Sequence, residues 1–136
     1  CIRVAAKAEA GAVNAVGGTH NCVACAIAGD STLAGRPASA TNLFPGRPIP
    51  GGNALIEQYA GASWRAVSGR AAIENELLAA GNGARGIVYG TNGTEAHVWN
   101  AVVQRGSVNF VDFQGIGPSG PASFNQWNTF YFVRTN

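Results

Sequence analysis

The order of patterns along the chain predicts an α+β fold with N-terminal helices packed on a C-terminal antiparallel sheet. Apolar residues recur at helical spacing up to about residue 80, and later apolar runs are rich in β-branched and aromatic residues. Two of these later runs flank Arg105-Gly106, which predicts a β-hairpin. The 136 residues suffice for a single domain with its own core. Because the chain begins at Cys1 without Met, we expect residues 1–136 to be the C-terminal part of a longer protein.

The composition excludes two classes of partner. Charged residues make up 12% of the chain, the net charge is +2, and the nine basic residues, all Arg except Lys7, are scattered. A charge this small and dispersed does not indicate nucleic-acid binding. No apolar run reaches the roughly 18 residues of a membrane-spanning helix, and no signal peptide is apparent, so we also expect no membrane partner.

The first clear helix signal follows a Gly-Gly turn and starts at a cysteine. Asn21 is a suitable N-cap for a helix that begins at Cys22 and ends near Gly29 or Gly35, before a proline. The first turn of a helix has unpaired N–H groups and a favourable dipole, and both favour the thiolate form of Cys22. Cys25 lies one turn later, and we expect its thiol to be buried.

The other elements follow from spacing and from turn residues. They are expected as a surface loop over residues 36–53, a short helix over 53–59, a helix over 70–80 that ends at Gly81, a strand over 84–89 joined through Asn92-Gly93 to the hairpin over 95–114, and a last strand over 128–133.

The predicted hairpin places a base, its orienting acid and an amide donor on one face. With Arg105-Gly106 as the turn, facing residues share a side of the sheet, and the register groups His97, Trp99, Asp112 and Gln114. His97 and Asp112 are then diagonal neighbours with Cα atoms roughly 7–8 Å apart, within reach of an imidazole–carboxylate hydrogen bond. One extra residue in the turn would separate this pair, because it would reverse the parity.

We expect the cysteine helix to pack on the same face of the sheet as His97. That face also carries apolar residues that need cover, namely Trp99, Val103, Val108 and Phe110. This packing would bring the thiol at the start of the helix toward the imidazole.

A thiol at a helix start, an imidazole on a strand and a carboxylate behind it are the parts of a nucleophilic thiol site. Cys22 would be the nucleophile, His97 the base that later protonates the leaving group, and Asp112 the acid that fixes the imidazole tautomer. Helix N–H groups and an amide such as that of Gln114 can hold the developing oxyanion. This chemistry needs no metal or cofactor.

Several other interpretations use the same residues. Cys22, His97 and Asp112 could each be structural, and Asp30 and Arg36 are expected to brace the loop after the helix. A Cys-x-x-Cys redox motif is normally found in a βαβ pattern, which the sequence around Cys22 and Cys25 lacks. A zinc site would need two more ligands. His20 is a weaker candidate for the base. Three cysteines leave at least one thiol unpaired, so the role of Cys1 is open.

Four motifs together resemble the papain-fold toxin domains of bacterial polymorphic toxins. They are Asn21-Cys22-x-x-Cys25-Ala26, the run from Asp30 through Leu33-Ala34-Gly35-Arg36-Pro37 to Ala40, His97-Val98-Trp99-Asn100, and Val111-Asp112-Phe113-Gln114. The separation of 15 residues between His97 and Asp112 is also similar to that in related deamidase domains of secreted toxins. The position six residues before Cys22, where papain has its oxyanion glutamine, is Val16 and departs from that pattern.

The resemblance implies a papain-like fold and a glutamine deamidase that acts as a secreted toxin. It matches Cys22 to the nucleophile, His97 to the base and Asp112 to its partner, with Gln114 and Asn21 as supporting residues. The match by itself does not decide between Cys22 and Cys25 as the nucleophile, and we choose Cys22 because of its predicted place in the first turn. The expected partners are a target protein with a susceptible glutamine and a cognate immunity protein, after delivery into a target cell by a bacterial secretion system. A protease or a transglutaminase could use the same triad, and a non-enzymatic binding module would use none of it.

Overall fold

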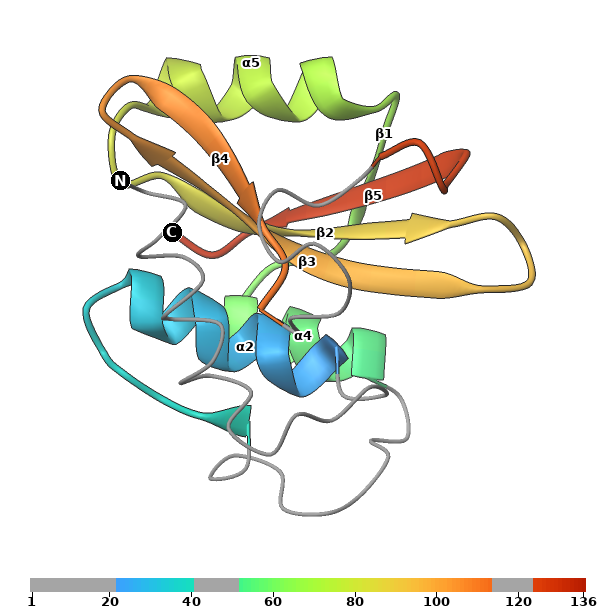
Figure 1. Cartoon of the computed structure of the whole chain (residues 1–136), viewed down its shortest axis with the longest axis horizontal. Coiled ribbons are helices and arrows are strands. Elements are labelled where there is room, and N and C mark those ends of the chain that lie inside the picture. The colour runs from blue at the N-terminus through green and yellow to red at the C-terminus, as the bar shows by residue number, and fades with distance from the viewer. Residues whose placement is uncertain (1–21, 41–51, 114–123) are drawn as a thin grey trace.

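The structure is a computed structural model that describes residues 22–40, 52–113 and 124–136 (Figure 1). Its elements confirm the predicted α+β class, with helices mostly before the sheet. In chain order they are α2 (Cys22–Leu33), α4 (Gly52–Ala60), β1 (Arg65–Val67), α5 (Arg70–Ala80), β2 (Arg85–Thr91), β3 (Ala96–Gln104), β4 (Ser107–Val111) and β5 (Thr129–Arg134).

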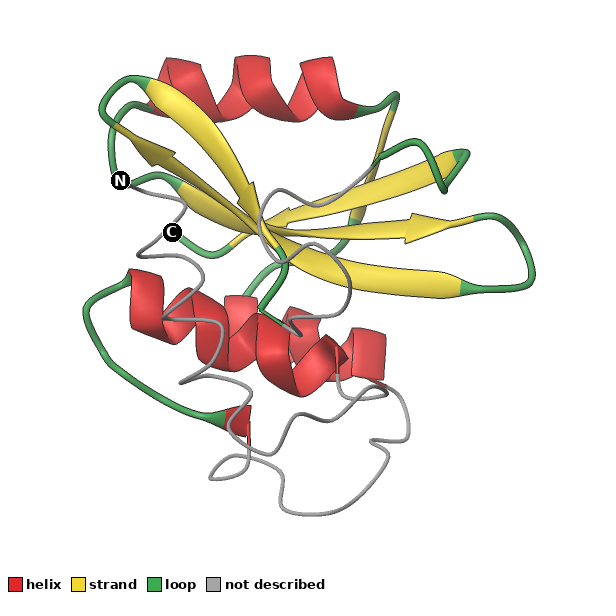
Figure 2. Cartoon of the chain, viewed as in Figure 1, coloured by secondary structure: helices red, strands yellow, loops and turns green. Residues whose placement is uncertain are grey.

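The described strands form one antiparallel sheet in the order β1-β5-β2-β3-β4. Figure 2 shows helices on both sides of this sheet, with α5 on one side and α2 and α4 on the other. Ile73 and Leu77 of α5 pack into the same core cluster as Trp99, whereas Ala26 and Ile27 of α2 pack into the cluster of Val98. The domain is therefore built of three layers, with a separate core on each face of the sheet.

The hairpin has the predicted register. Gln104 pairs with Ser107, and the pairing continues to Asn100 opposite Val111. The turn residues have φ values of 53° at Arg105 and 74° at Gly106, the conformation that suits a two-residue hairpin loop. The backbone N–H of Gly106 also donates to Asn82 Oδ1 at 2.8 Å, which ties this turn to the segment before β2.

The prediction that α2 covers the face of His97 and Trp99 is wrong. That face is covered by α5, and α2 lies on the opposite face, where Asn100 Nδ2 donates to Ala26 O at 2.9 Å. The error arose because β3 is buried continuously over residues 98–103, so both of its faces need cover. Hydrophobic alternation cannot say which helix covers which face of such a strand.

The cysteine helix ends at Leu33 and is capped by Gly35, the second of the two predicted stops. Gly35 has φ +84°, its N–H donates to Thr32 O at 3.0 Å, and the N–H of Arg36 donates to Ser31 O at 2.9 Å, which is a Schellman cap. Gly29 lies inside α2 and has a packing role instead. A Cβ built there would lie 2.2 Å from Phe113 Cδ2, so only glycine lets this ring pack against the helix.

Two further differences concern short elements. The helix predicted over residues 53–59 is α4, which is longer by one residue at each end. Strand β1 was not predicted, because it has only three residues, two of them exposed, and pairs only with β5.

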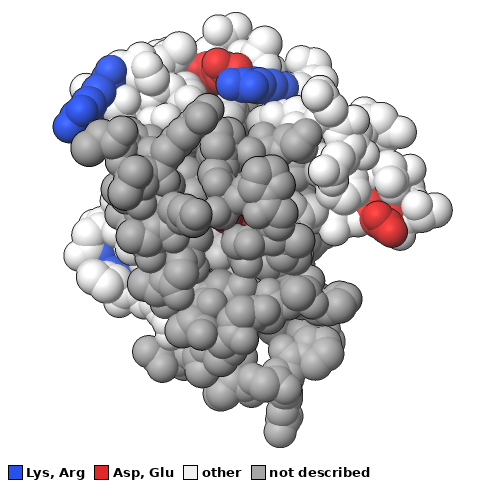
Figure 3. Space-filling view, in the orientation of Figure 1, with Lys and Arg blue, Asp and Glu red and all other residues white. Residues whose placement is uncertain are grey.

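The predicted 36–53 loop lies largely outside the described residues. Among the residues that are described, charged side chains are few on the face seen in Figure 3 and do not gather in one patch.

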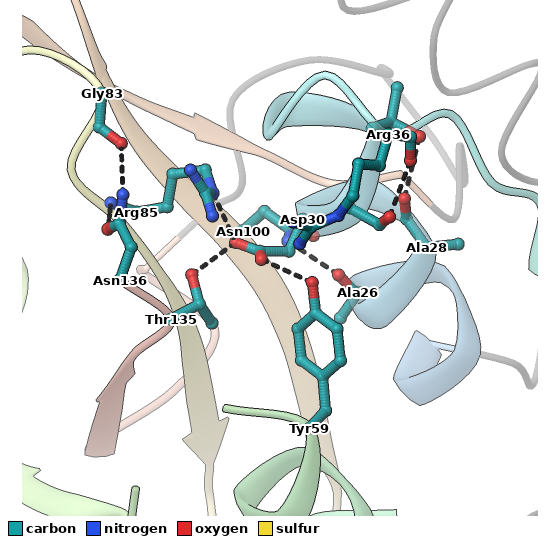
Figure 4. A network of polar contacts seen from close by, with 12 residues as sticks. Ala26, Ala28, Asp30, Arg36, Tyr59, Gly83, Arg85, Asn100, Thr135 and Asn136 are labelled. Atoms are coloured by element: carbon teal, nitrogen blue, oxygen red, sulfur yellow. Dashed lines mark hydrogen bonds and ion pairs between the residues drawn. The ribbon is translucent and has the colours of Figure 1, made fainter. Parts of the chain in front are cut away.

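The far end of α2 is anchored by a buried carboxylate (Figure 4). Asp30 is 1% exposed. It accepts hydrogen bonds from Tyr59 Oη at 2.7 Å and Thr135 Oγ1 at 2.6 Å, and Arg85 Nε lies 3.3 Å away in an ion pair. Burial first, and then the hydrogen bond to Asp30, raises the pKa of Tyr59 to about 12. Asp30 therefore braces α2 against α4, β2 and the segment after β5.

Candidate active site

The two cysteines of α2 have different surroundings. Cys22 is the first residue of the helix and is half-buried, whereas Cys25 is 1% exposed and packs in the cluster that contains Phe113. Burial, with smaller contributions from the charges of Asp112 and Cys22, raises the pKa of the Cys25 thiol to about 12. Cys25 is therefore a neutral thiol at physiological pH and a poor nucleophile, in agreement with its predicted burial.

His97 and Asp112 are joined as the hairpin register predicts. His97 Nε2 lies 2.8 Å from Asp112 Oδ2, and each side chain is 19% exposed. His97 is the second residue of β3, and Asp112 directly follows the last residue of β4. The hydrogen bond therefore closes the open end of the hairpin, opposite its turn.

The ring of His97 also interacts with Cys22. Burial by itself lowers the pKa of His97, but hydrogen bonds to Asp112 and Cys22, together with their charges, outweigh burial and raise it to about 9. His97 is therefore protonated at neutral pH. Because Nε2 is bonded to Asp112, Nδ1 is the ring nitrogen left to face the thiol.

The chain direction after β4 explains how the three groups meet. The backbone passes Asp112 and then places Phe113 against Ala24, Cys25 and Ala28 of α2. This crossing brings the end of β4 to the first turn of the helix. Cys22 therefore reaches His97 at the point where α2 begins, although the helix lies on the other face of β3.

The supporting residues Asn21 and Gln114 lie outside the described residues, as do Cys1, His20 and Val16, so their roles stay predictions. Within residues 22–40, 52–113 and 124–136, no group of three or more His, Cys, Asp or Glu side chains has an arrangement that could hold a metal ion. In the same ranges, no helix is long and apolar enough to cross a membrane.

Trp99 also contacts the site. From the sequence it is expected only to be an apolar residue that needs cover. Its ring stacks on that of His97, with centroids 5.9 Å apart and an interplanar angle of 23°. The signal was available in the sequence, because residues i and i+2 of a strand share a face.

A known protein family matches most of the chain. Residues 20–115 match a family described as papain fold toxin 1, glutamine deamidase. The chain belongs to this family. No match was found among curated proteins or among solved structures.

The papain fold toxin 1 match confirms the resemblance stated from the sequence motifs. It begins just before α2 and ends just after β4, so it includes Cys22, His97 and Asp112, while β5 lies beyond it. The helices and the antiparallel sheet are consistent with a papain-like fold. The family description gives the activity as glutamine deamidation and the biological class as a toxin.

Proposed function

We propose that this chain is a cysteine-dependent protein glutamine deamidase in which Cys22, His97 and Asp112 act together. The observation that carries the proposal is the position of the His97 ring, which is bonded to Asp112 at 2.8 Å and interacts with the Cys22 thiol. A protonated imidazole beside a cysteine favours the nucleophilic thiolate. The family description, glutamine deamidase, supports a glutamine side chain as the substrate.

In the first half of the reaction, the Cys22 thiolate adds to the carboxamide carbon of the target glutamine. The carbonyl oxygen becomes an oxyanion, which the unpaired N–H groups of the first turn of α2 can stabilise. His97 gives its proton to the amide nitrogen, the C–N bond breaks, and ammonia leaves. The product is a thioester between Cys22 and the substrate, and His97 is now neutral.

In the second half, neutral His97 takes a proton from a water molecule as the water oxygen adds to the thioester carbon. The C–S bond then breaks, which releases glutamate and returns the Cys22 thiolate with a protonated His97. One water is consumed and one ammonia is formed. Asp112 keeps the ring oriented through both halves and stabilises its positive charge.

The decisive experiment is mass spectrometry of candidate target proteins after incubation with the chain. We expect Gln→Glu conversion that is abolished by Cys22→Ala. The matched control is Cys25→Ala, which removes the neighbouring thiol, and we expect this variant to keep its activity. Conversion that survives in Cys22→Ala would refute the mechanism.

The same assay separates deamidation from the other reactions of a thioester. Addition of a primary amine tests whether an amine replaces water in the second half, since crosslinked product would indicate a transglutaminase. Cleaved target chains would indicate a protease. We expect glutamate as the main product with and without the amine.

We also propose that the chain acts as an effector delivered into a target cell and is neutralised by an immunity protein that covers Cys22. The toxin description of the family supports this role. Expression inside cells should slow growth for the wild type and not for Cys22→Ala. A neutralising partner should protect Cys22 from alkylation by iodoacetamide in the purified complex, and continued alkylation at the free rate would contradict the proposed binding site.

A further inference from the structure

The stacking of His97 on Trp99 belongs to a larger aromatic arrangement. Trp99 is 0% exposed, and Phe124 packs edge-on against its ring with centroids 5.2 Å apart and an interplanar angle of 86°. Phe124 in turn contacts the rings of Phe110 and Phe130 at 4.8 and 5.3 Å. The indole therefore contacts both the His97 ring and this aromatic cluster, and it cannot swing without disturbing the cluster.

The strand next to β3 leaves room for this arrangement at one position. Gly90 of β2 is the cross-strand partner of His97, and the two residues share a face of the sheet. A Cβ built at Gly90 would lie 2.8 Å from Trp99 Cη2 and 2.8 Å from Trp127 Cγ. The space that a side chain would fill beside His97 is occupied instead by the two indole rings.

We propose that Trp99, seated over Gly90, is a positioning residue that holds the His97 ring between Cys22 and Asp112. This inference rests on the proposed function, because it assigns Trp99 a role in proton transfer at Cys22. An imidazole has freedom about two side-chain torsions, and a fixed stacking partner restricts both. The negative face of an indole also attracts the positive charge of a protonated imidazole.

The groups that set the charge of His97 are few. Asp112 faces it from the end of β4 and Cys22 from the start of α2, while β2 contributes only Gly90 at the facing position. If the ring becomes mobile, it loses its hydrogen bonds and its burial together. The hydrogen bonds outweigh burial in the native fold, so the pKa of His97 should fall from about 9 toward its ordinary value of 6.5.

The test compares Trp99→Leu with Phe132→Leu. Both residues are 0% exposed and lie in the same core cluster, and both variants lose an aromatic ring, but Phe132 lies on β5. The readouts are the His97 pKa by NMR and the rate of Cys22 alkylation by iodoacetamide against pH. The chain has only two histidines, so the spectrum can be assigned with His97→Gln.

We expect Trp99→Leu to lower the His97 pKa by about one unit and to slow alkylation at neutral pH by about tenfold. Trp99→Phe, a smaller ring with a weaker negative face, should give an intermediate value, and Phe132→Leu should match the wild type. If Trp99→Leu does not fold, the comparison of Trp99→Phe with Phe132→Leu decides. Equal His97 pKa values and equal alkylation profiles in the Trp99 and Phe132 variants would overturn the inference.

Neither readout depends on deamidation. A chain that lacks deamidase activity but shows the shifted His97 pKa in Trp99→Leu would refute the proposed function and leave the positioning role intact. A Trp99→Leu variant that deamidates glutamine at the wild-type rate and has an unchanged His97 pKa would refute the positioning role and leave the proposed function intact.

Discussion

The two ends of α2 hold ionisable side chains in different ways. At the far end, which we call the anchor end (Asp30, Tyr59, Arg85 and Thr135), the carboxylate is 1% exposed and three groups from other elements bind it. At the near end, the site end (Cys22, His97 and Asp112), the imidazole and the carboxylate remain 19% exposed. A buried charge with all its partners fixes a structure, whereas the partly exposed pair beside the thiol keeps contact with solvent.

The largest expected effect is on activity, from Asp112→Asn at the site end. The amide cannot supply the negative charge that keeps His97 protonated, so turnover should fall by about a hundredfold to ten-thousandfold. The alkaline limb of the pH–rate profile should also move below pH 9, because the bond to Asp112 raises the pKa of His97. The free energy of unfolding of Asp112→Asn, measured in urea, should change little. If a loss of stability accounts for the whole loss of turnover, the contrast between the two ends is wrong.

The next effect is on stability, from Asp30→Ala at the anchor end. The substitution leaves the Arg85 guanidinium, 13% exposed, without its partner and should lower the free energy of unfolding by about 3–5 kcal/mol. Tyr59→Phe, which removes the hydrogen bond to Asp30, should cost only about 1 kcal/mol. Chemical denaturation measures both values, and the comparison fails if Asp30→Ala is as mild as Tyr59→Phe.

The third effect links the site end to pH. His97 has a pKa near 9 in the fold and 6.5 ordinarily, so its contribution to stability is complete below pH 6.5 and is lost as the pH rises to about 9. The loss should reach about 3 kcal/mol. His97→Gln should flatten the decline in the free energy of unfolding in this window. The decline above pH 9 should remain, because Cys25 and Tyr59 ionise there in the unfolded chain and their pKa values in the native fold are raised to about 12. A decline between pH 6.5 and 9 that persists in His97→Gln must come from another group.

The smallest effect concerns the end of the helix itself. Gly35→Ala places a Cβ at φ +84° and should lower the free energy of unfolding by about 1 kcal/mol. Activity per folded molecule should be unchanged, because the cap lies at the other end of α2 from Cys22. An alkylation rate of Cys22 that falls in Gly35→Ala would show that the two ends are coupled.

The sequence predicts the site end better than the anchor end. The turn at Arg105-Gly106 determines the parity of the hairpin, and parity alone brings His97 and Asp112 to one face. One partner of Asp30, Thr135, lies 105 residues away along the chain, and no local sequence signal indicates the contact. The packing of α2 could not be predicted either, because β3 is buried on both faces. The polar contact between β3 and the helix, from Asn100 Nδ2 to Ala26 O, has no signal in the sequence around Asn100.

The bond between Asp30 and Thr135 has a consequence for the order of folding. Strand β5 is made last among the described strands and lies between β1 and β2, so a translating ribosome must complete it before α2 acquires this anchor. Contacts between such distant residues form slowly. The contact between α2 and Thr135 therefore forms only after the other described strands have been synthesised, and nascent chains truncated before β5 should lack this anchor and be digested by protease more readily.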